Sequence, residues 1–142
     1  MMALGETGLV RWAVGRDVVY EDVLDRYIAH LRRPRARGLV LLDIIHGAST
    51  PDAERRRAVA AAVREIARSG EIVGHVVVTN SSVARGVLAA INWFADPGFP
   101  EVVVATPAEG LARARLMSPG VDPDAVLAAL QAEVPWFSAL RW

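Results

Sequence analysis

The spacing of hydrophobic and polar positions predicts repeated strand–helix units along this chain. Short and nearly continuous apolar runs at residues 39–45 (LVLLDII) and 73–79 are typical of strands that are covered on both faces. After each run, apolar residues recur every three or four positions, as they do in helices that pack on one side. Weaker runs predict a first strand at 8–14, at the sheet edge because Arg11 interrupts it, and a last strand at 102–105.

Helix start signals follow the predicted strands. Thr50, Pro51 and Asp52 combine an N-cap, a proline for the first turn and an acid, and residues 106–109 form a capping box. Ser81 or Ser82 caps a third helix, and Asp122 caps a last one. The predicted helices are 19–32, 50–68, 82–94, 107–117 and 123–134. The third helix should bury Val83, Val87, Leu88, Ile91 and Phe94.

Four successive strand–helix units with short connections imply right-handed crossovers and a mostly parallel sheet. We therefore expect a three-layer α/β fold. The 142 residues have the usual size of one domain, so residues 1–142 are interpreted as a single unit. Within it, residues 118–142 form a C-terminal helical extension with an aromatic tail.

Composition excludes several kinds of chemistry. The chain has no Cys, and all 16 of its basic residues are Arg, so thiol catalysis, lysine Schiff bases and cysteine metal sites are impossible. The formal net charge is zero, which gives no field for nucleic acid. The Arg-rich segments 32–37 and 55–57 are interpreted as solvated faces. No apolar stretch is long enough to span a membrane and no signal peptide is visible, so we expect a cytoplasmic protein.

Two stretches resemble the STAS family, the anti-anti-sigma-factor-like domains. They are Leu41-Leu42-Asp43-Ile44 and residues 75–81 (HVVVTNS) followed by Val87 and Leu88, and the likeness covers about residues 9–116. The resemblance implies a fold of four β/α turns and a non-enzymatic regulatory or adaptor role. Signalling members carry a switch serine in an Asp-Ser-Ser-Gly-like motif. Here that position reads Ser49-Thr50-Pro51-Asp52, so the chain is more similar to a divergent branch without the switch.

The carboxyl edge of the predicted sheet gathers the candidate binding residues. Ligands of α/β proteins usually bind at this edge, and free N–H groups at helix starts there favour anions or phosphoserine. Simple helix capping by the same hydroxyls is the alternative interpretation. The candidate residues are Asp43, His46, Ser49, Thr50, Asn80, Ser81 and Ser82.

No catalytic or metal site is predicted. Asp43, His46 and either Ser81 or Ser82 would offer an acid, a base and a nucleophile, but no G-x-S-x-G elbow accompanies them. We expect Asp43 to hydrogen-bond a loop. The histidines His30, His46 and His75 lack metal-ligand spacing, and His75 should be a hydrogen-bonded residue within its strand. We expect no cofactor.

The tail concentrates Trp136, Phe137 and Trp142 within seven residues. Such residues pack either on their own domain or on a second copy, since tryptophan is common at both kinds of surface. The sequence therefore favours a non-enzymatic regulatory or adaptor module that binds a protein partner, including a homodimer, without nucleic acid or membrane insertion. The alternative is a small-ligand, lipid or anion binder, or an enzyme, that uses the carboxyl edge.

Overall fold

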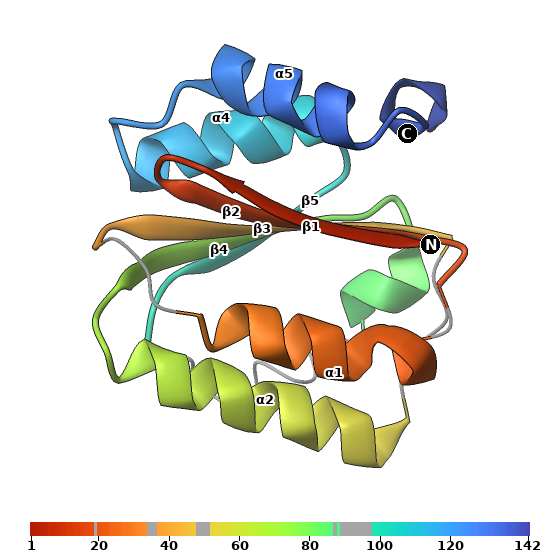
Figure 1. The fold of residues 1–142 in the computed structure, drawn as a ribbon, viewed down its shortest axis with the longest axis vertical. Helices are drawn as coiled ribbons and strands as arrows, with labels where there is room; N and C mark the ends of the chain where they lie inside the picture. The colour runs from red at the N-terminus through yellow and green to blue at the C-terminus, as the bar shows by residue number, and fades with distance from the viewer. Residues whose placement is uncertain (19, 34–36, 48–51, 87, 89–97) are drawn as a thin grey trace.

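The computed structural model has three layers, with a central sheet between two pairs of helices (Figure 1). It describes residues 1–142 except 19, 34–36, 48–51, 87 and 89–97. Helices α1 (Tyr20–Leu31) and α2 (Ala53–Ala67) cover one face of the sheet. Helices α4 (Pro107–Met117) and α5 (Pro123–Glu133) cover the other face. The three-layer α/β prediction is confirmed.

The strands lie in the sheet in the same order as in the chain. The first two strands pair antiparallel, and every later neighbour pairs parallel. The sheet is therefore mostly parallel, as predicted, and its central strand is the apolar run 39–45. The five strands are β1 (Met2–Thr7), β2 (Val10–Arg16), β3 (Leu39–His46), β4 (Ile72–Val78) and β5 (Glu101–Val104).

The prediction that residues 8–14 form the edge strand of the sheet was wrong. The run at 8–14 corresponds to β2, which lies between β1 and β3, and the edge strand is β1. Gly8, with a φ of 54°, makes the turn between the two strands, a conformation that glycine adopts without steric cost. Arg11 tolerates an interior strand because its guanidinium is paired with Glu6 and bonded to backbone carbonyls.

Helix capping follows the sequence signals with one correction. The capping box of Thr106 and Glu109 is present at α4, and Asp122 caps α5. Helix α2 begins at Ala53 and is capped by Asp52, whose carboxylate accepts from the Arg55 N–H. The acid therefore performs the role that the sequence assigned to Thr50, a residue outside the described part of the chain.

The third predicted helix is described only at residues 82–86 and 88, which are helical. Val83 was expected in its buried face, yet it is 68% exposed. It lies in the first turn, past the last residue of β4, so the sheet offers it no surface. Leu88 is partly buried. Val87, Ile91 and Phe94 lie outside the described residues.

Two apolar cores lie on opposite faces of the sheet. The core under α4 and α5 includes Trp12, Leu42 and Val76, and the core under α1 and α2 includes Leu24 and Leu41. Phe137 and Leu140 of the tail are buried in the first core, and Trp136 and Trp142 pack against it. The extension at 118–142 thus packs on the same core as α4. Among the described residues, no helix combines the length and hydropathy of a membrane span.

Candidate functional site

The carboxyl edge of the sheet brings together some of the predicted site residues. His46 is the last residue of β3, and Asn80 and Ser81 follow β4. Ser82 lies in the first turn of the next helix and is exposed. Ser49 and Thr50 are outside the described residues. Asp43 lies three residues before the end of β3, within the sheet, so it is not an edge residue.

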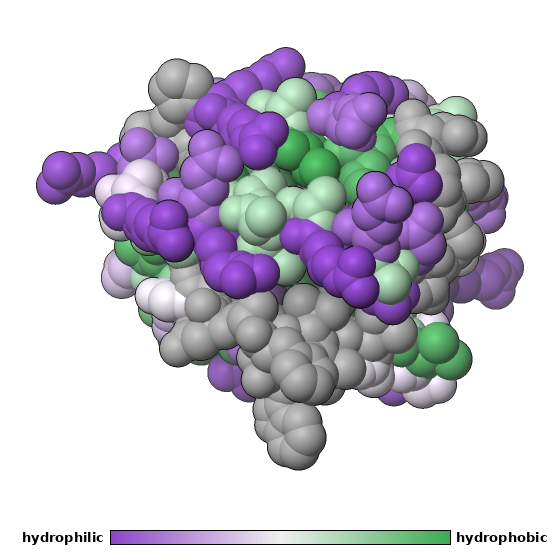
Figure 2. Space-filling model, turned by 90° about the horizontal axis from the view of Figure 1, so that it is seen from below, coloured by the Kyte–Doolittle hydropathy of each residue, from purple (hydrophilic) through white to green (hydrophobic). Residues whose placement is uncertain are grey.

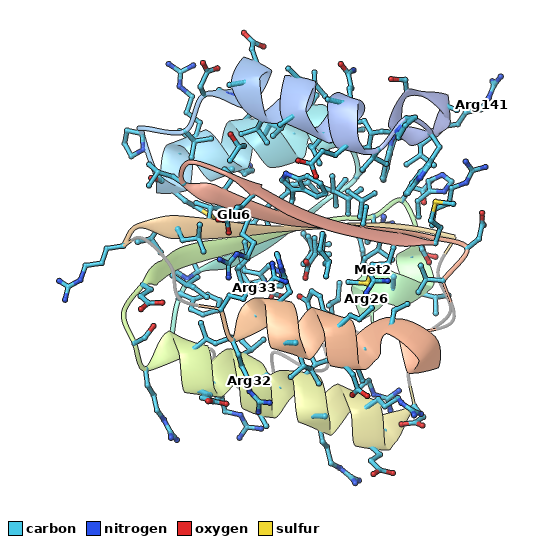
Figure 3. All side chains as sticks on the ribbon, viewed as in Figure 1. Met2, Glu6, Arg26, Arg32, Arg33 and Arg141 are labelled. Carbon is cyan, nitrogen blue, oxygen red and sulfur yellow. The ribbon has the colours of Figure 1, made fainter. Side chains whose placement is uncertain are left out.

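The chain's own tail covers this edge. The backbone carbonyl of Arg141 lies 3.0 Å from Nε2 of His46 and accepts at 3.5 Å from Nδ2 of Asn80. The Trp142 ring meets the His46 ring edge to face, with centroids 5.2 Å apart. Figure 3 shows Arg141 at the end of the molecule where the parallel strands finish. His46 and Asn80, two of the residues expected to bind a ligand, therefore contact the tail at residues 141 and 142.

A second contact holds the start of the tail. The guanidinium of Arg16, at the end of β2, lies 5.9 Å from the centre of the Trp136 ring, within the range of a cation–π contact. Both tryptophans of the tail thus contact residues that end strands. The aromatic tail packs on its own domain, which is one of the two alternatives that the sequence left open.

Ser81 acts as a helix cap, as the sequence suggested. Its hydroxyl accepts from the Ala84 N–H at 3.2 Å, and its own N–H donates to Oγ1 of Thr79 at 3.3 Å. Arg85 donates from its guanidinium to the Thr79 carbonyl at 3.2 Å. These bonds stabilise the turn between β4 and the helix, and they account for the serine without any ligand.

A chain of hydrogen bonds crosses the sheet beneath α1. His75 of β4 lies between two carboxylates, with Nε2 3.0 Å from Asp43 and Nδ1 2.7 Å from Glu101. Tyr27 of α1 donates its hydroxyl proton to the same Asp43 oxygen. These side chains are almost completely covered, with 8% of His75, 16% of Asp43 and 11% of Glu101 exposed. Among the described residues, the partners of Asp43 lie on a neighbouring strand and a helix, whereas the sequence predicted a bond to a loop.

The two carboxylates fix the charge of His75. Burial alone lowers the pKa of His75, but the hydrogen bonds to Asp43 and Glu101 and the negative charges of both groups raise it by more, to about 10. The ring is therefore an imidazolium at neutral pH, with both N–H groups donated. Such a ring cannot accept a proton, so His75 does not supply a general base. Its prediction as a hydrogen-bonded strand residue agrees with this geometry.

Asp43, His75 and Glu101 form a polar row across the sheet, and an ion pair extends this row to the edge strand β1. Arg11, only 3% exposed, donates from Nη2 to Glu6 at 2.7 Å and from Nη1 to the His30 carbonyl at 3.0 Å. The charge-assisted bond from Arg11 holds the pKa of Glu6 below its usual value. Arg11 thereby ties the sheet to the end of α1.

Sequence reasoning missed Tyr27, Glu101 and Arg11 as members of one arrangement. A usable signal existed, because Asp43, His75 and Glu101 are each an ionisable residue within or at the start of an apolar strand. Alternation along each strand then places them on one face of the sheet once the register is known.

No group of His, Cys, Asp or Glu side chains among the described residues is arranged to hold a metal ion. Comparisons of the chain with protein-family models, curated proteins and solved structures find no match.

Proposed function

We propose that this chain is a non-enzymatic regulatory or adaptor module that acts by binding a protein partner. The observation that carries the proposal is the tail over the carboxyl edge. Ligand sites of open α/β sheets usually lie in a crevice at that edge. Here the Arg141 carbonyl contacts His46 and Asn80 and the Trp142 ring contacts His46, so the tail occupies part of that edge and the outer helix faces offer further surfaces for binding.

The buried polar row supports a binding role over catalysis. His75 holds its proton between Asp43 and Glu101, and Asp43 also accepts from Tyr27. Each of these groups has a hydrogen-bonded partner inside the fold, so the arrangement is satisfied without a substrate. The order of strand–helix units agrees with the resemblance to STAS domains, whose role is mostly regulatory, and we include that family relationship in the proposal.

The face formed by α1 and α2 offers a surface for a protein. Figure 2 shows hydrophobic residues gathered in the middle of this face and hydrophilic residues around them. Ala58 and Ala61 are exposed on α2, and Val59 and Val63 beside them are only partly buried. Apolar area with a polar rim is the usual composition of a protein interface.

Arginines dominate the charged residues of α2, whereas α1 is acidic, with Glu21, Asp22 and Asp25 against Arg26. Residues 52–68 contain five arginines and three acids, namely Arg55, Arg56, Arg57, Arg64 and Arg68 against Asp52, Glu54 and Glu65. Residues 107–134, which include α4 and α5, show the opposite balance, with two arginines and four acids. Arg57 and Arg64 are exposed and lie four residues before and three after Ala61, so they flank it on the helix surface. The partner should therefore present acidic groups opposite α2.

Site-specific crosslinking in the cell of origin tests the proposal. A photoreactive phenylalanine in place of Ala61 should capture a protein partner, while the same residue in place of Ala112 on α4 serves as the matched control. The double variant Arg57→Glu/Arg64→Glu should abolish capture at position 61, and Arg113→Glu/Arg115→Glu should leave it unchanged. The absence of any captured protein at position 61 would count against the proposal, and so would equal capture at both positions.

A small-ligand, lipid or anion binder at the carboxyl edge is the second candidate. It is favoured by the accessible donors of Asn80 and by the short span of tail, residues 141–142, that contacts His46 and Asn80 there. A thermal-shift screen with nucleotides, phosphates and fatty acids would detect such a ligand, because binding to the folded state raises Tm. The screen should include Trp142→Ala, in which the ring no longer covers His46. No shift for either protein would exclude this candidate.

A further inference from the structure

Strand β1 exposes one side of its backbone. The Arg16 N–H donates to the Met1 carbonyl at 2.8 Å, and the register pairs Ala3 with Val14 and Gly5 with Trp12. Bonded and non-bonded pairs alternate along an antiparallel pair. Residues 1, 3, 5 and 7 therefore bond β2, and Met2, Leu4 and Glu6 point their N–H and C=O groups away from the sheet. No described strand pairs with that side, and Figure 1 shows β1 in front with no element before it.

The two edges of the sheet are protected very differently. Proteins usually guard an edge strand by short length, charged side chains, proline or a bulge. Strand β5 has only four residues and directly follows Pro100. Strand β1 has six residues (MALGET), contains neither Pro nor Lys, and pairs with β2 in an unbroken register. Its one charged residue, Glu6, is paired with Arg11 of β2. An unguarded edge of this length is a template for another extended strand.

We propose that β1 pairs antiparallel with β1 of a second copy of this chain, around a two-fold axis at Leu4, so that two sheets join into one. This inference rests on the proposed function of protein binding and names one of its partners. Leu4 then lies opposite Leu4 of the second copy, and Met2 lies opposite Glu6 at both ends. Each of the three facing pairs exchanges two bonds, which gives about six backbone hydrogen bonds in total.

The side chains select this register and this occupant. A pairing shifted toward the end of β1 would place the two Glu6 carboxylates opposite each other, and like charges in that position are destabilising. The Leu4-centred pairing keeps them apart, at opposite ends of the strand pair. Figure 3 shows Met2 and Glu6 toward the two ends of β1. A two-fold interface also closes on itself, because the β1 edges of both copies are covered at once. A strand from another protein would cover the β1 edge of one molecule only.

Amide exchange on the unmodified protein tests the pairing directly. The amides of Ala3, Gly5 and Thr7 bond β2 and should be protected at every protein concentration. Those of Met2, Leu4 and Glu6 should exchange freely in dilute solution and become protected as the sedimentation mass rises from one copy to two. Free exchange of Leu4 at concentrations where the mass is that of two copies would overturn the proposal, and so would a single-copy mass up to about millimolar concentration, where even weak pairing would show.

A proline variant tests the same contact. In Leu4→Pro the lost N–H is one that faces away from β2, so the bonds of β1 to β2 remain and only the intermolecular pairing loses a donor. The variant should sediment as one copy, whereas Leu116→Lys, a matched change at an apolar residue that is 73% exposed on α4, should sediment as the unmodified protein does. A folded Leu4→Pro protein that still pairs would overturn the proposal. Should it fail to fold, the exchange experiment decides.

The two proposals fail separately. A chain that sediments as one copy and is still captured at position 61 by another protein overturns the β1 pairing and leaves the proposed function standing. A chain that pairs through β1 and yields no partner at position 61 supports the pairing and removes the α1–α2 surface from the proposed function.

Discussion

The two faces of the sheet are built in opposite ways. Beneath α4 and α5, the inward residues of three neighbouring strands are apolar and fully covered, among them Trp12, Leu42 and Val76. Beneath α1 and α2, the equivalent positions include Arg11, Asp43 and His75, each paired with an opposite charge. One face is thus held by hydrophobic burial, and the other combines burial with a row of charges.

The difference suggests a division of roles between stability and register. Apolar contacts tolerate some repacking, whereas a buried charge without its partner is strongly unfavourable. His75 of β4 bonds both Asp43 of β3 and Glu101 of β5, and a one-residue slip of β4 would turn it to the apolar face. We infer that the polar row fixes the alignment of three strands while the apolar face supplies most of the stability.

Removing a large side chain from the apolar face should have the largest effect. Trp12 is 1% exposed, and its ring packs against Gly5 of β1. Trp12→Ala should lower the free energy of unfolding by about 3–5 kcal/mol, measured by urea denaturation. The exposed Leu116 provides the control, since Leu116→Ala should change stability by less than about 0.5 kcal/mol. A similar loss for both variants would contradict the core assignment.

Removing one residue of the polar row should cause the next largest loss of stability. Glu101→Leu leaves the Nδ1–H group of the buried His75 without its acceptor and should cost about 1–3 kcal/mol. The triple variant Asp43→Leu/His75→Leu/Glu101→Leu removes every one of these charges together and should lie near the unmodified protein in stability. Should the triple variant be less stable than Glu101→Leu, the row would be a major source of stability and the division of roles would be wrong.

Substitution of two helical glycines by alanine should have opposite effects, because one packs closely on the sheet and the other does not. Helix α4 approaches the apolar face so closely that a Cβ on Gly110 would lie 2.6 Å from Cγ2 of Val78. Gly110→Ala should therefore destabilise by about 1–3 kcal/mol. Gly86 is also helical, but no atom of the described residues lies within 4 Å of such a Cβ, so Gly86→Ala should stabilise by about 0.5–1 kcal/mol. Thermal unfolding followed by circular dichroism measures both, and equal signs would contradict the packing.

Alkaline pH should weaken the contribution of the polar row to stability and leave the apolar face unchanged. The pKa of His75 rises from 6.5 in the unfolded chain to about 10 in the fold, so between these values the folded state holds a proton that the unfolded chain releases. The contribution is complete below pH 6.5 and is lost as pH rises through about 10. Stability should fall by up to about 1.4 kcal/mol per pH unit in that interval. The triple leucine variant should lack this slope, and an unchanged slope would assign it to other groups.

The sequence predicts most of the elements because their signals are local. The run LVLLDII identifies the central strand, and the capping box at Thr106 and Glu109 locates the start of α4 within one residue. Strand β1 escaped notice because MALGET is short, contains Gly5 and alternates only weakly. It becomes a strand by pairing with β2, which is a tertiary effect that local patterns do not report.

The candidate site is less predictable because it depends on register. His46 and Asn80 were placed at the correct edge, yet their contact with Arg141 joins residues up to 95 positions apart. The Asp43–His75 bond requires knowing that Leu41 pairs with His75 in the parallel ladder, and no local pattern specifies that alignment.

The strand order carries a consequence for how the chain folds. Because each strand lies beside its neighbour in sequence, the sheet can be assembled one strand at a time through contacts closer in sequence than those of the tail. The contact between His46 and the Arg141 carbonyl spans 95 residues. Closing this long loop costs more entropy than pairing neighbouring strands, so we expect the contact to form last. The chain should therefore acquire its sheet before its tail docks on the carboxyl edge.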